Sequence, residues 1–380
     1  VADRLRASVR EEDTISRFGG DEFAILFRDI NSYEQCEQLL IRLHQTLAEP
    51  YWIDNRRITI SASSGVALYP MDNVDLDTLL RHADQAMYQA KMTGRNKSRL
   101  FNPELNQQVI QKHHVVQRLR EALLNDEFVL HYQPEINMRT GEIIAVEALI
   151  RWQHPQRGLL FPGDFLTDME GSELEFELGL WVIDSALQQL QYWQQGGLDI
   201  VVSVNIAANH LHAKNFIQSL QQILNRYHDI RPASLQLEIL ESSALGDVTT
   251  LSRIIDDCRE RVGVLIALDD FGTGYSSLTH LRHLAANSVK IDQSFVRDML
   301  EDASDYNIVD GVISLAKAFN RQVIAEGVET VEHGLMLLSM GCDHAQGYQI
   351  ARPMPAQHIM NWCQAYQLQP EWREFHDNNV

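Results

Sequence analysis

The chain has 380 residues, of which 45% are hydrophobic, so it is long enough for two globular domains. Its formal net charge of −20 argues against a DNA or RNA polymer as partner, because such partners need a basic surface. No apolar run approaches the roughly 20 residues of a membrane span, and the four cysteines form no CxxC pair, so we expect a cytoplasmic protein with reduced thiols and no membrane segment in this chain.

The sequence pattern predicts that the chain starts inside a helix. Val1, Leu5 and Val9 share one helical face, and the first residue is not Met. We therefore expect the chain to be a fragment, and any membrane anchor or sensor to lie in the missing upstream part.

The next elements are predicted to be a hairpin, a helix, two strands and a second helix. Residues 14–27 contain two β-prone runs joined by paired glycines, which is typical of a hairpin. A helical pattern at 32–49 ends at Pro50, and residues 57–70 are predicted to form a pair of strands. The second helical pattern ends at Gly94.

A polar, weakly amphipathic segment at 101–127 is predicted to be a linker helix. From Phe128 to about Gln364 strands and helices alternate, and this stretch is close to the ~250 residues of one (β/α)₈ barrel. The predicted bounds are 1–101 for a partial α/β domain, 102–114 for the linker helix region, 115–366 for the barrel and 367–380 for a C-terminal tail.

Seven short apolar runs in the barrel region each end in a polar or charged side chain that does not suit a hydrophobic core. After the second, they recur at the spacing of a strand-plus-helix unit. The runs end at Glu147, Asn205, Glu238, Asp269 with Asp270, Lys290, Glu326 and Gln346. Strand ends and the loops that follow them carry the chemistry of a (β/α) barrel, so we expect these side chains to converge on one site.

The predicted site has the donor chemistry of a metal centre. Carboxylate and amide oxygens are hard ligands that suit Mg²⁺ or Mn²⁺ and not zinc. The adjacent Asp269 and Asp270 can each supply a ligand to one of two metals, an arrangement used for displacement at phosphorus. A single acid of this kind is usually a helix cap or a surface charge, but caps need not fall at the same end of every strand.

Two cations accompany the acids. Lys290 is flanked by apolar residues, which disfavours a surface lysine, and an ammonium near metals can orient or deprotonate an attacking water. Arg151, predicted to lie just beyond the strand of Glu147, could clamp a phosphate oxygen, and a surface salt bridge is the less favoured alternative. Gly272 and Gly274 indicate a sharply turning loop next to the paired aspartates, with Ser276 or Ser277 as a possible helix cap.

The strings EALIRW, VNIAA, LEILES, DDFGTGYSSL, VKID, AEGVET and QGY occur in this order, and together they resemble the EAL domain family from about Val115 to Gln364. The resemblance implies a modified TIM barrel that uses two Mg²⁺ or Mn²⁺ ions to hydrolyse cyclic di-GMP to linear pGpG. It also implies a homodimer formed through the EAL domain.

The resemblance assigns roles to individual residues. The implied metal ligands are Glu147, Asn205, Glu238, Asp269 and Asp270, with Glu326 in the metal and water shell. Lys290 is implied to activate water, beside Asp292, and Glu241 to steady the loop 269–278. The implied substrate contacts are Gln133, Arg151, Asp292 and Gln346. The stretch FPGDFLTDMEGSELEFELG departs from the family pattern, which usually has a proline after Phe-Ile and is less acidic there.

In the first domain, SRFGGDEFAILF resembles the GGDEF signature of diguanylate cyclases, and ALYP, ADQAMYQAK and GRN match later parts of that family. The signature residues are Gly19, Gly20, Asp21, Glu22 and Phe23. Arg10 and Asp13 stand at the spacing of the family's RxxD inhibitory site, and charges that cap a helix end are an equally good interpretation.

The first half of the GGDEF family's domain, with its other metal-binding aspartate, is not in this sequence, so we do not expect cyclase activity from the chain. The leading hypothesis is a cyclic di-GMP phosphodiesterase with a GGDEF regulatory domain. The alternatives are a non-catalytic sensor of the dinucleotide, which the complete set of acids disfavours, and a bifunctional full-length parent. An unrelated metal-dependent barrel enzyme, such as one acting on sugar phosphates, is disfavoured by the family strings.

Overall fold

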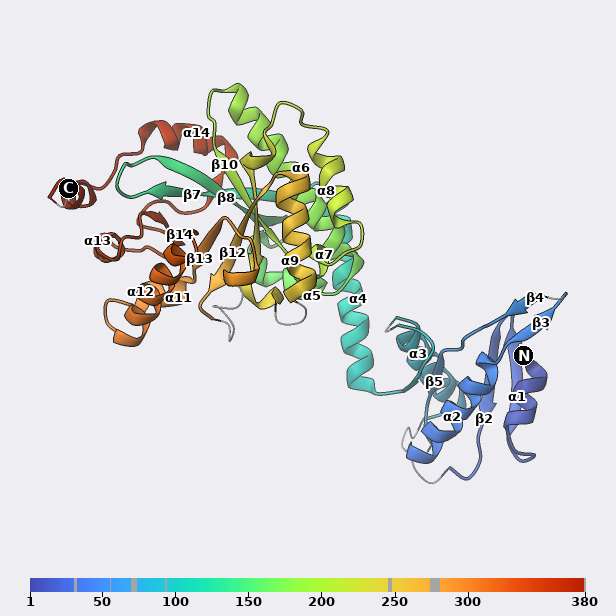
Figure 1. Ribbon diagram of the computed structural model, residues 1–380. Helices are drawn as coiled ribbons and strands as arrows, with labels where there is room; N and C mark the ends of the chain where they lie inside the picture. The colour runs from blue at the N-terminus through green and yellow to red at the C-terminus, as the bar shows by residue number, and fades with distance from the viewer. Residues whose placement is uncertain are drawn as a thin grey trace. The chain divides into compact units, whose positions relative to one another are not determined.

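The computed structural model of the chain describes residues 1–30, 33–54, 56–69, 74–92, 94–244, 248–273 and 281–378. The chain divides into two compact units, Val1–Val115 and Val116–Val380. Each unit is described by itself, and many of their elements are labelled in Figure 1.

The first unit contains three helices and short strands among its described residues. In chain order they are α1 (Ala2–Ser8), β1 (Thr14–Gly19), β2 (Glu22–Leu26), α2 (Tyr33–Ala48), β3 (Tyr51–Ile53), β4 (Arg56–Ile58), β5 (Ser64–Val66), α3 (Leu76–Met92) and β6 (Ser98–Leu100). β1 and β2 form the predicted antiparallel hairpin. Its apolar side packs on a small core of Leu5, Leu43 and Leu47, so the hairpin is supported by helices α1 and α2.

The prediction that residues 57–70 form a strand pair is wrong. β4 pairs with the preceding β3 in an antiparallel hairpin, and β5 pairs in parallel with the distant β6. Asp54, which directly follows β3, has a positive φ of 47°. β5 also packs closely against helix α3: a Cβ on Gly65 would meet the Ala83 carbonyl oxygen at 1.9 Å, so the approach requires glycine.

The second unit is an eight-stranded closed barrel, and the predicted fold class is confirmed. Its strands are β7 (Phe128–Asn137), β8 (Ile143–His154), β10 (Val201–Ile206), β11 (Leu235–Leu240), β12 (Leu265–Phe271), β13 (Ser288–Ile291), β14 (Gln322–Ala325) and β15 (His344–Gln346). The order is β7-β15-β14-β13-β12-β11-β10-β8, and pairing of β7 with β8 closes the ring. Seven strands are parallel, whereas β7 runs antiparallel to both neighbours, which is the modification of the (β/α)₈ plan.

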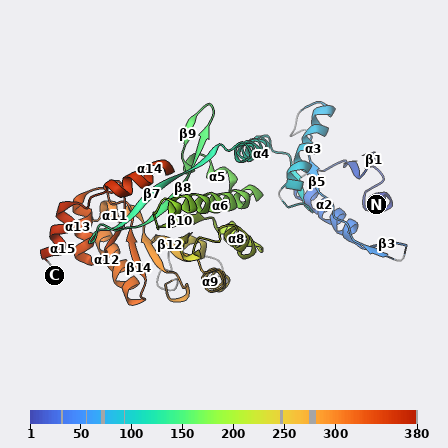
Figure 2. The same ribbon diagram turned by 90° about the horizontal axis from the view of Figure 1, so that it is seen from above.

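Helices surround the strands of the barrel, as Figure 2 shows. They are α5 (Leu166–Met169), α6 (Glu173–Gln195), α7 (Ala208–Leu211), α8 (Phe216–Leu224), α9 (Val248–Asp256), α11 (Gln293–Asp298), α12 (Ala303–Ala318), α13 (Val331–Met340), α14 (Ala356–Ala365) and α15 (Pro370–Asn378). The core lies between helices and strands. Trp193 of α6, for example, is fully buried and packs edge-on against Tyr132 of β7 at 4.7 Å between ring centroids.

The predicted linker helix is present as α4 (Pro103–Leu124), and it runs directly into the barrel. Leu119 and Ala122 are fully buried near its end. Three residues separate α4 from the first barrel strand, and the last of them, Glu127, fixes the junction. Its carboxylate accepts hydrogen bonds from Arg118 at 2.6 Å and from the Trp152 indole at 2.8 Å. The end of α4 is therefore part of the barrel's packing.

Candidate active site

The polar residues that end the apolar runs meet at the carboxyl end of the parallel strands. Glu147, Asn205, Glu238, Asp269, Lys290 and Gln346 lie on six different strands, and Asp270 and Glu326 lie at or just beyond the ends of β12 and β14. Their strands are paired in register around the barrel, for example Asn205 with Glu238. The side chains of this layer therefore share the interior of the barrel mouth.

The prediction that Glu147 ends its strand, with Arg151 just beyond, is wrong. β8 continues to His154. Pairing with β10 stops at Ala148, but β7 and the short β9 (Gly158–Leu160) pair with the rest of β8. The strand is therefore extended by antiparallel neighbours that the local pattern does not reveal.

Lys290 is at the centre of the site and is completely buried. Its Nζ lies 2.6 Å from Glu326 Oε1, 3.0 Å from Glu238 Oε2 and 3.4 Å from Glu147 Oε2. Burial by itself would lower the pKa of Lys290, but the charges of the surrounding carboxylates outweigh this effect and raise the pKa well above its usual value. In this arrangement Lys290 is an ammonium that donates hydrogen bonds.

Two amide hydrogen bonds and the nearby Lys290 ammonium keep Glu147 ionised. Asn205 Nδ2 donates to its Oε1 and Gln346 Nε2 donates to its Oε2, each at 2.7 Å. Burial tends to raise the pKa of Glu147, but Lys290 and the two amide hydrogen bonds lower it below its usual value. Glu147 is therefore ready to bind a cation without first losing a proton.

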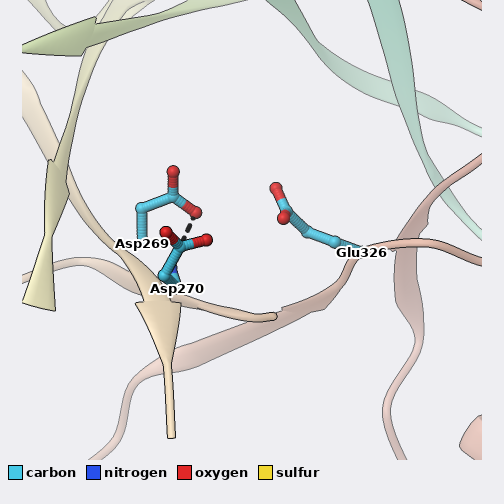
Figure 3. A group of neighbouring side chains, drawn as sticks. All are labelled: Asp269, Asp270 and Glu326. Carbon is cyan, nitrogen blue, oxygen red and sulfur yellow. Dashed lines mark hydrogen bonds between the residues drawn. The ribbon is translucent and has the colours of Figure 1, made fainter. Parts of the chain in front are cut away.

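Asp269, Asp270 and Glu326 form an acidic cluster in which ligand oxygens lie within 4.8 Å of one another. Figure 3 shows the two aspartates at one strand end, with Glu326 reaching toward them from the opposite side. Burial, followed by the charge of Asp269 and Asp292, raises the pKa of Asp270 to about 7. Burial raises the pKa of Glu326 to about 8, and Asp269 and Glu147 add to this against the opposing effect of Lys290. The surroundings therefore do not keep all three acids ionised below about pH 7.

The backbone at the paired aspartates is strained, and this conformation places both side chains in the acidic cluster. Asp270 has a positive φ of 53°, which is uncommon for a residue other than glycine. The register between β12 and β13 shifts between Leu268 and Phe271. The Asp270 N–H donates to Asp269 Oδ1 at 2.9 Å. This bulge brings two consecutive side chains to the same side of the strand, where normal alternation would separate them.

The residues present fit a bound cation. Glu238 is almost fully buried, and its Oε1 has no hydrogen-bond partner among the described residues; the same is true of Gln346 Oε1. Burial, with Glu147 and Asp269 as further causes, raises the pKa of Glu238 well above its usual value. Unpartnered buried oxygens beside an excess of acids are what a divalent ion with oxygen ligands would satisfy.

The predicted substrate contacts flank these acids. Gln346 Nε2 also donates to Gln133 Oε1 at 3.1 Å, and Gln133 Nε2 donates to the Ala351 carbonyl at 2.9 Å. Asp292 caps α11 by accepting from the Ser294 N–H at 2.9 Å. Arg151 donates to the Ile150 carbonyl at 2.8 Å. These residues line the site, and their contact with a substrate remains a prediction.

Glu241 contacts the start of the loop that follows the aspartates. It is buried at the start of the 3₁₀ turn Glu241–Ala244, and its Oε2 accepts from the Gly272 N–H at 3.1 Å. Gly272 has a φ of 105°, where glycine is favoured. The rest of the predicted loop, including Gly274, Ser276, Ser277 and Leu278, lies outside the described residues.

The sequence did not single out Glu135, a buried acid one layer deeper in the barrel. It lies on β7, pairs in register with Gln346, and is 1% exposed. Neither carboxylate oxygen has a hydrogen-bond partner in the described part of the chain. Burial raises its pKa to about 7, with Lys290 opposing and Glu147 adding. The sequence did contain one signal: Glu135 lies two residues after Gln133, so the two side chains share one face of the strand.

Comparison with known proteins identifies the barrel. Residues 116–353 match the family described as EAL domain. The chain belongs to the EAL domain family. A solved structure titled "PaMucR Phosphodiesterase, c-di-GMP complex" is similar to this chain with 39% identity and a TM-score of 0.62, over 65% of this chain and 99% of that chain.

Curated relatives share both parts of the chain. The bifunctional diguanylate cyclase/cyclic di-GMP phosphodiesterase MucR of Pseudomonas aeruginosa is 40% identical, over 95% of this chain and 52% of that protein. The cyclic di-GMP phosphodiesterase PdeR of Escherichia coli is 37% identical, over 95% of this chain and 54% of that protein. The chain thus spans about half the length of these relatives. No helix in the described ranges of this EAL protein combines the length and apolarity that a membrane span requires.

N-terminal to the EAL barrel, residues 1–97 match the family described as diguanylate cyclase, GGDEF domain. Gly19, Gly20, Asp21 and Glu22 are exposed at the turn of the β1–β2 hairpin, where Gly20 has a φ of 51°. Phe23 packs against the small core of this unit. The signature's acids are thus presented on a turn.

The predicted inhibitory pair has a structural role in this unit. The Asp13 carboxylate accepts from the backbone N–H groups of Arg10 at 2.9 Å and Arg28 at 3.1 Å. Asp13 therefore holds a turn together, and the Arg10 side chain is exposed. A role for Arg10 and Asp13 in binding a dinucleotide remains a prediction.

Proposed function

We propose that this chain hydrolyses cyclic di-GMP to linear pGpG. The observation that carries the proposal is the buried Lys290 ammonium surrounded by carboxylates at the carboxyl end of an EAL barrel, beside the acidic cluster of Asp269, Asp270 and Glu326. Many enzymes that cleave phosphodiesters use such a set of hard oxygen ligands to hold divalent ions near the phosphorus.

Two Mg²⁺ or Mn²⁺ ions are proposed as cofactors. The residues that would hold them are Glu147, Asn205, Glu238, Asp269, Asp270 and Glu326. When bound, the ions neutralise charge on the phosphodiester and make a bound water more acidic. Burial raises the pKa of Glu238 and that of Glu326, and a cation held beside them would lower both pKa values.

The protein's own groups orient the reactants in this proposal. Lys290, as an ammonium, donates to and orients the attacking water; the catalytic set is Lys290 with Glu147 and Glu326. Gln133, Arg151, Asp292 and Gln346 position the substrate. Asp292 is fixed for this role by its cap on α11, and Gln346 by its bonds to Glu147 and Gln133. Preorganised donors of this kind stabilise charge that develops during the reaction.

The remaining parts of the proposal concern the chain around the site. The bounds 1–101, 102–114, 115–366 and 367–380 are proposed as a GGDEF portion, linker helix region, EAL phosphodiesterase barrel and tail. The GGDEF portion is proposed to regulate the barrel. A cytoplasmic location, a homodimer formed through the EAL domain, and the absence of a DNA or RNA polymer partner are proposed with it.

The experiment is direct assay of the purified chain with cyclic di-GMP and Mg²⁺ or Mn²⁺, with the product identified by chromatography. We expect pGpG, no turnover in excess chelator, and strong inhibition by Ca²⁺, which prefers longer bonds and more ligands. Glu147→Ala should abolish hydrolysis while the barrel stays folded by circular dichroism. Full turnover in excess chelator, or binding of the dinucleotide without any hydrolysis, would contradict the proposal; the second result would support the sensor alternative.

A further inference from the structure

An exposed phenylalanine lies at a position where local structure gives no reason for it. Phe161 directly follows β9 and is 56% exposed. It is the N-cap of the 3₁₀ turn Pro162–Asp164, a position where Ser, Thr, Asp or Asn is preferred because these side chains can accept a backbone hydrogen bond. Residues that break a local rule without a local benefit are candidates for function. Phe161 also opens the stretch in which the sequence departs from the EAL pattern.

The strand register places Phe161 on the side of the active site. In the β8–β9 pair Trp152 lies opposite Leu160, so the next residue, Phe161, follows opposite Arg151. Trp152 and Leu160 are both buried on the other face. Side chains alternate along a strand, so Arg151 shares its face with Glu147, four residues earlier. The phenylalanine ring therefore continues the face that carries the acids, toward the outer end of β8, which Figure 2 shows as a hairpin with β9.

The ring is held in place from two directions. The Phe161 N–H donates to Asp164 Oδ2 at 2.9 Å, which fixes the backbone. The guanidinium of Arg151 lies over the ring at 4.9 Å from its centroid. Arg151 is only 5% exposed, and its Nε has no hydrogen-bond partner within the described ranges. A buried guanidinium with an unused donor thus lies beside an aromatic ring that faces solvent.

A second exposed aromatic ring that contacts an arginine lies near the barrel mouth. Tyr348, two residues beyond Gln346, is 51% exposed, and the Arg352 guanidinium lies 4.2 Å from its ring centroid. Tyr348 is near enough to Arg151 to act on its pKa, which burial lowers. Exposed aromatic rings backed by arginine are the surfaces on which nucleobases stack.

We propose that Phe161 is a substrate-binding residue whose exposed ring stacks on one purine base of the cyclic dinucleotide, while Arg151 supports the ring and offers its free donor to the same substrate. This inference rests on the proposed function, because it assigns the base to the substrate of that site. Stacking is tolerant of base identity. Phe161 therefore selects a substrate that carries a flat base over a simple phosphodiester, and it acts on binding and not on the chemical step.

The test uses the full chain and four variants: Phe161→Ala, Phe161→Leu, Phe161→Tyr and the control Leu159→Ala. Leu159 is an apolar residue of the same hairpin and is 38% exposed. It lies two residues before Phe161 and pairs with Gln153, not with Arg151. The dissociation constant for cyclic di-GMP is measured by calorimetry with Ca²⁺ present, and KM and kcat are measured with Mn²⁺. Thermal melting checks that each variant is folded.

We expect Phe161→Ala to raise Kd and KM about tenfold, within the range found for base stacking, and to leave kcat within about twofold. Phe161→Leu should behave like the alanine variant, and Phe161→Tyr and Leu159→Ala like the wild type. An unchanged Kd in Phe161→Ala overturns the inference. A wild-type Kd in Phe161→Leu also overturns the inference, because any apolar side chain beneath Arg151 would then be sufficient and base stacking would not be needed.

The outcome separates this inference from the proposed function. A wild-type chain that binds cyclic di-GMP but does not hydrolyse it contradicts the proposed function, while the Kd comparison still decides the role of Phe161. A wild-type chain that does not bind cyclic di-GMP overturns both.

Discussion

At the scale of single residues, the site is governed by a charge imbalance around Lys290. One ammonium contacts three carboxylates, and further acids lie nearby. The sequence predicted this residue because a lysine within an apolar run has no other simple explanation. It did not predict Glu135, because a lone acid in a strand is normally a surface residue and only closure of the barrel buries it.

Changing Lys290 to Met should destabilise the chain strongly when no metal is bound. Removing one partner of a buried ionic group leaves uncompensated charge and costs about 3–5 kcal/mol. We expect this loss in urea unfolding at pH 8, a smaller loss at pH 5, where Asp270 and Glu326 are protonated, and a fall in kcat of at least about a hundredfold.

The matched control is Lys317→Met, since the Lys317 ammonium is exposed and donates to the Met340 carbonyl at 3.0 Å. It should change stability by less than about 1 kcal/mol. If the two variants lose equal stability, or if Lys290→Met weakens substrate binding as much as turnover, then Lys290 does not have the role proposed here.

Without metal, the barrel should become less stable as pH rises. Asp270 and Glu326 have folded pKa values of about 7 and 8, above their usual values of 3.8 and 4.5. Acids with raised pKa favour the folded state while protonated, so this stability is present below about pH 4 and is lost as pH rises through 7 and 8. Melting temperatures in chelator from pH 5 to 8.5 check this.

Mn²⁺ should reverse the trend, because the ion competes with the bound protons and its affinity therefore rises with pH. The increase in melting temperature on adding Mn²⁺ is expected to be largest at pH 8. A metal-free chain whose stability rises with pH over this range would show that these acids are not the dominant titrating groups.

At the scale of elements, local patterns predicted what local interactions determine. The β1–β2 hairpin follows from its glycine pair, and helices α2 and α3 follow from their periodicity and their stops. The partners of short strands were less predictable. β4 and β5 are adjacent in sequence yet pair elsewhere, and the direction of β7 is set by closure of the ring. Such pairings depend on contacts between distant residues, which periodicity does not contain.

Gly347 is an element-level constraint on the site. A Cβ at this position would lie 2.2 Å from the Val328 carbonyl oxygen and 2.3 Å from its nitrogen. Gly347→Ala must therefore push β15 away from the loop after β14, at a cost of about 1–3 kcal/mol, and displace the neighbouring Gln346. We expect both a lower melting temperature and reduced kcat. Gly163→Ala, which meets nothing within 4 Å, should change neither.

Glu241 should matter for turnover although it is not among the proposed metal ligands. Its bond to the Gly272 N–H ties the end of β11 to the start of the loop after the aspartates. Glu241→Ala should reduce kcat about tenfold through misplacement of the Asp269–Asp270 segment. Glu241→Gln keeps an acceptor oxygen and should retain most activity. Normal turnover in Glu241→Ala would leave this loop an ordinary connection.

At the scale of the whole molecule, we predict that the chain forms a homodimer through the EAL barrel and that association tunes catalysis by shifting the loop after Asp270 between two arrangements. A ligand or partner can shift such an equilibrium only through different contacts in the two states. Light scattering over a dilution series, with activity measured at each concentration, checks this. A strictly monomeric chain with constant specific activity would remove the regulatory argument.

The reversed direction of β7 has a mechanical consequence. Because β7 runs against the parallel strands, it starts at the rim that holds the acids: Phe128, its first residue, pairs with Trp152 near the carboxyl end of β8. Helix α4 therefore leads into the barrel at the end of the strands where the acids lie. Five residues farther along the same strand is Gln133, which contacts Gln346. A rotation of helix α4 would therefore be transmitted along β7 to Gln133, one of the proposed substrate contacts.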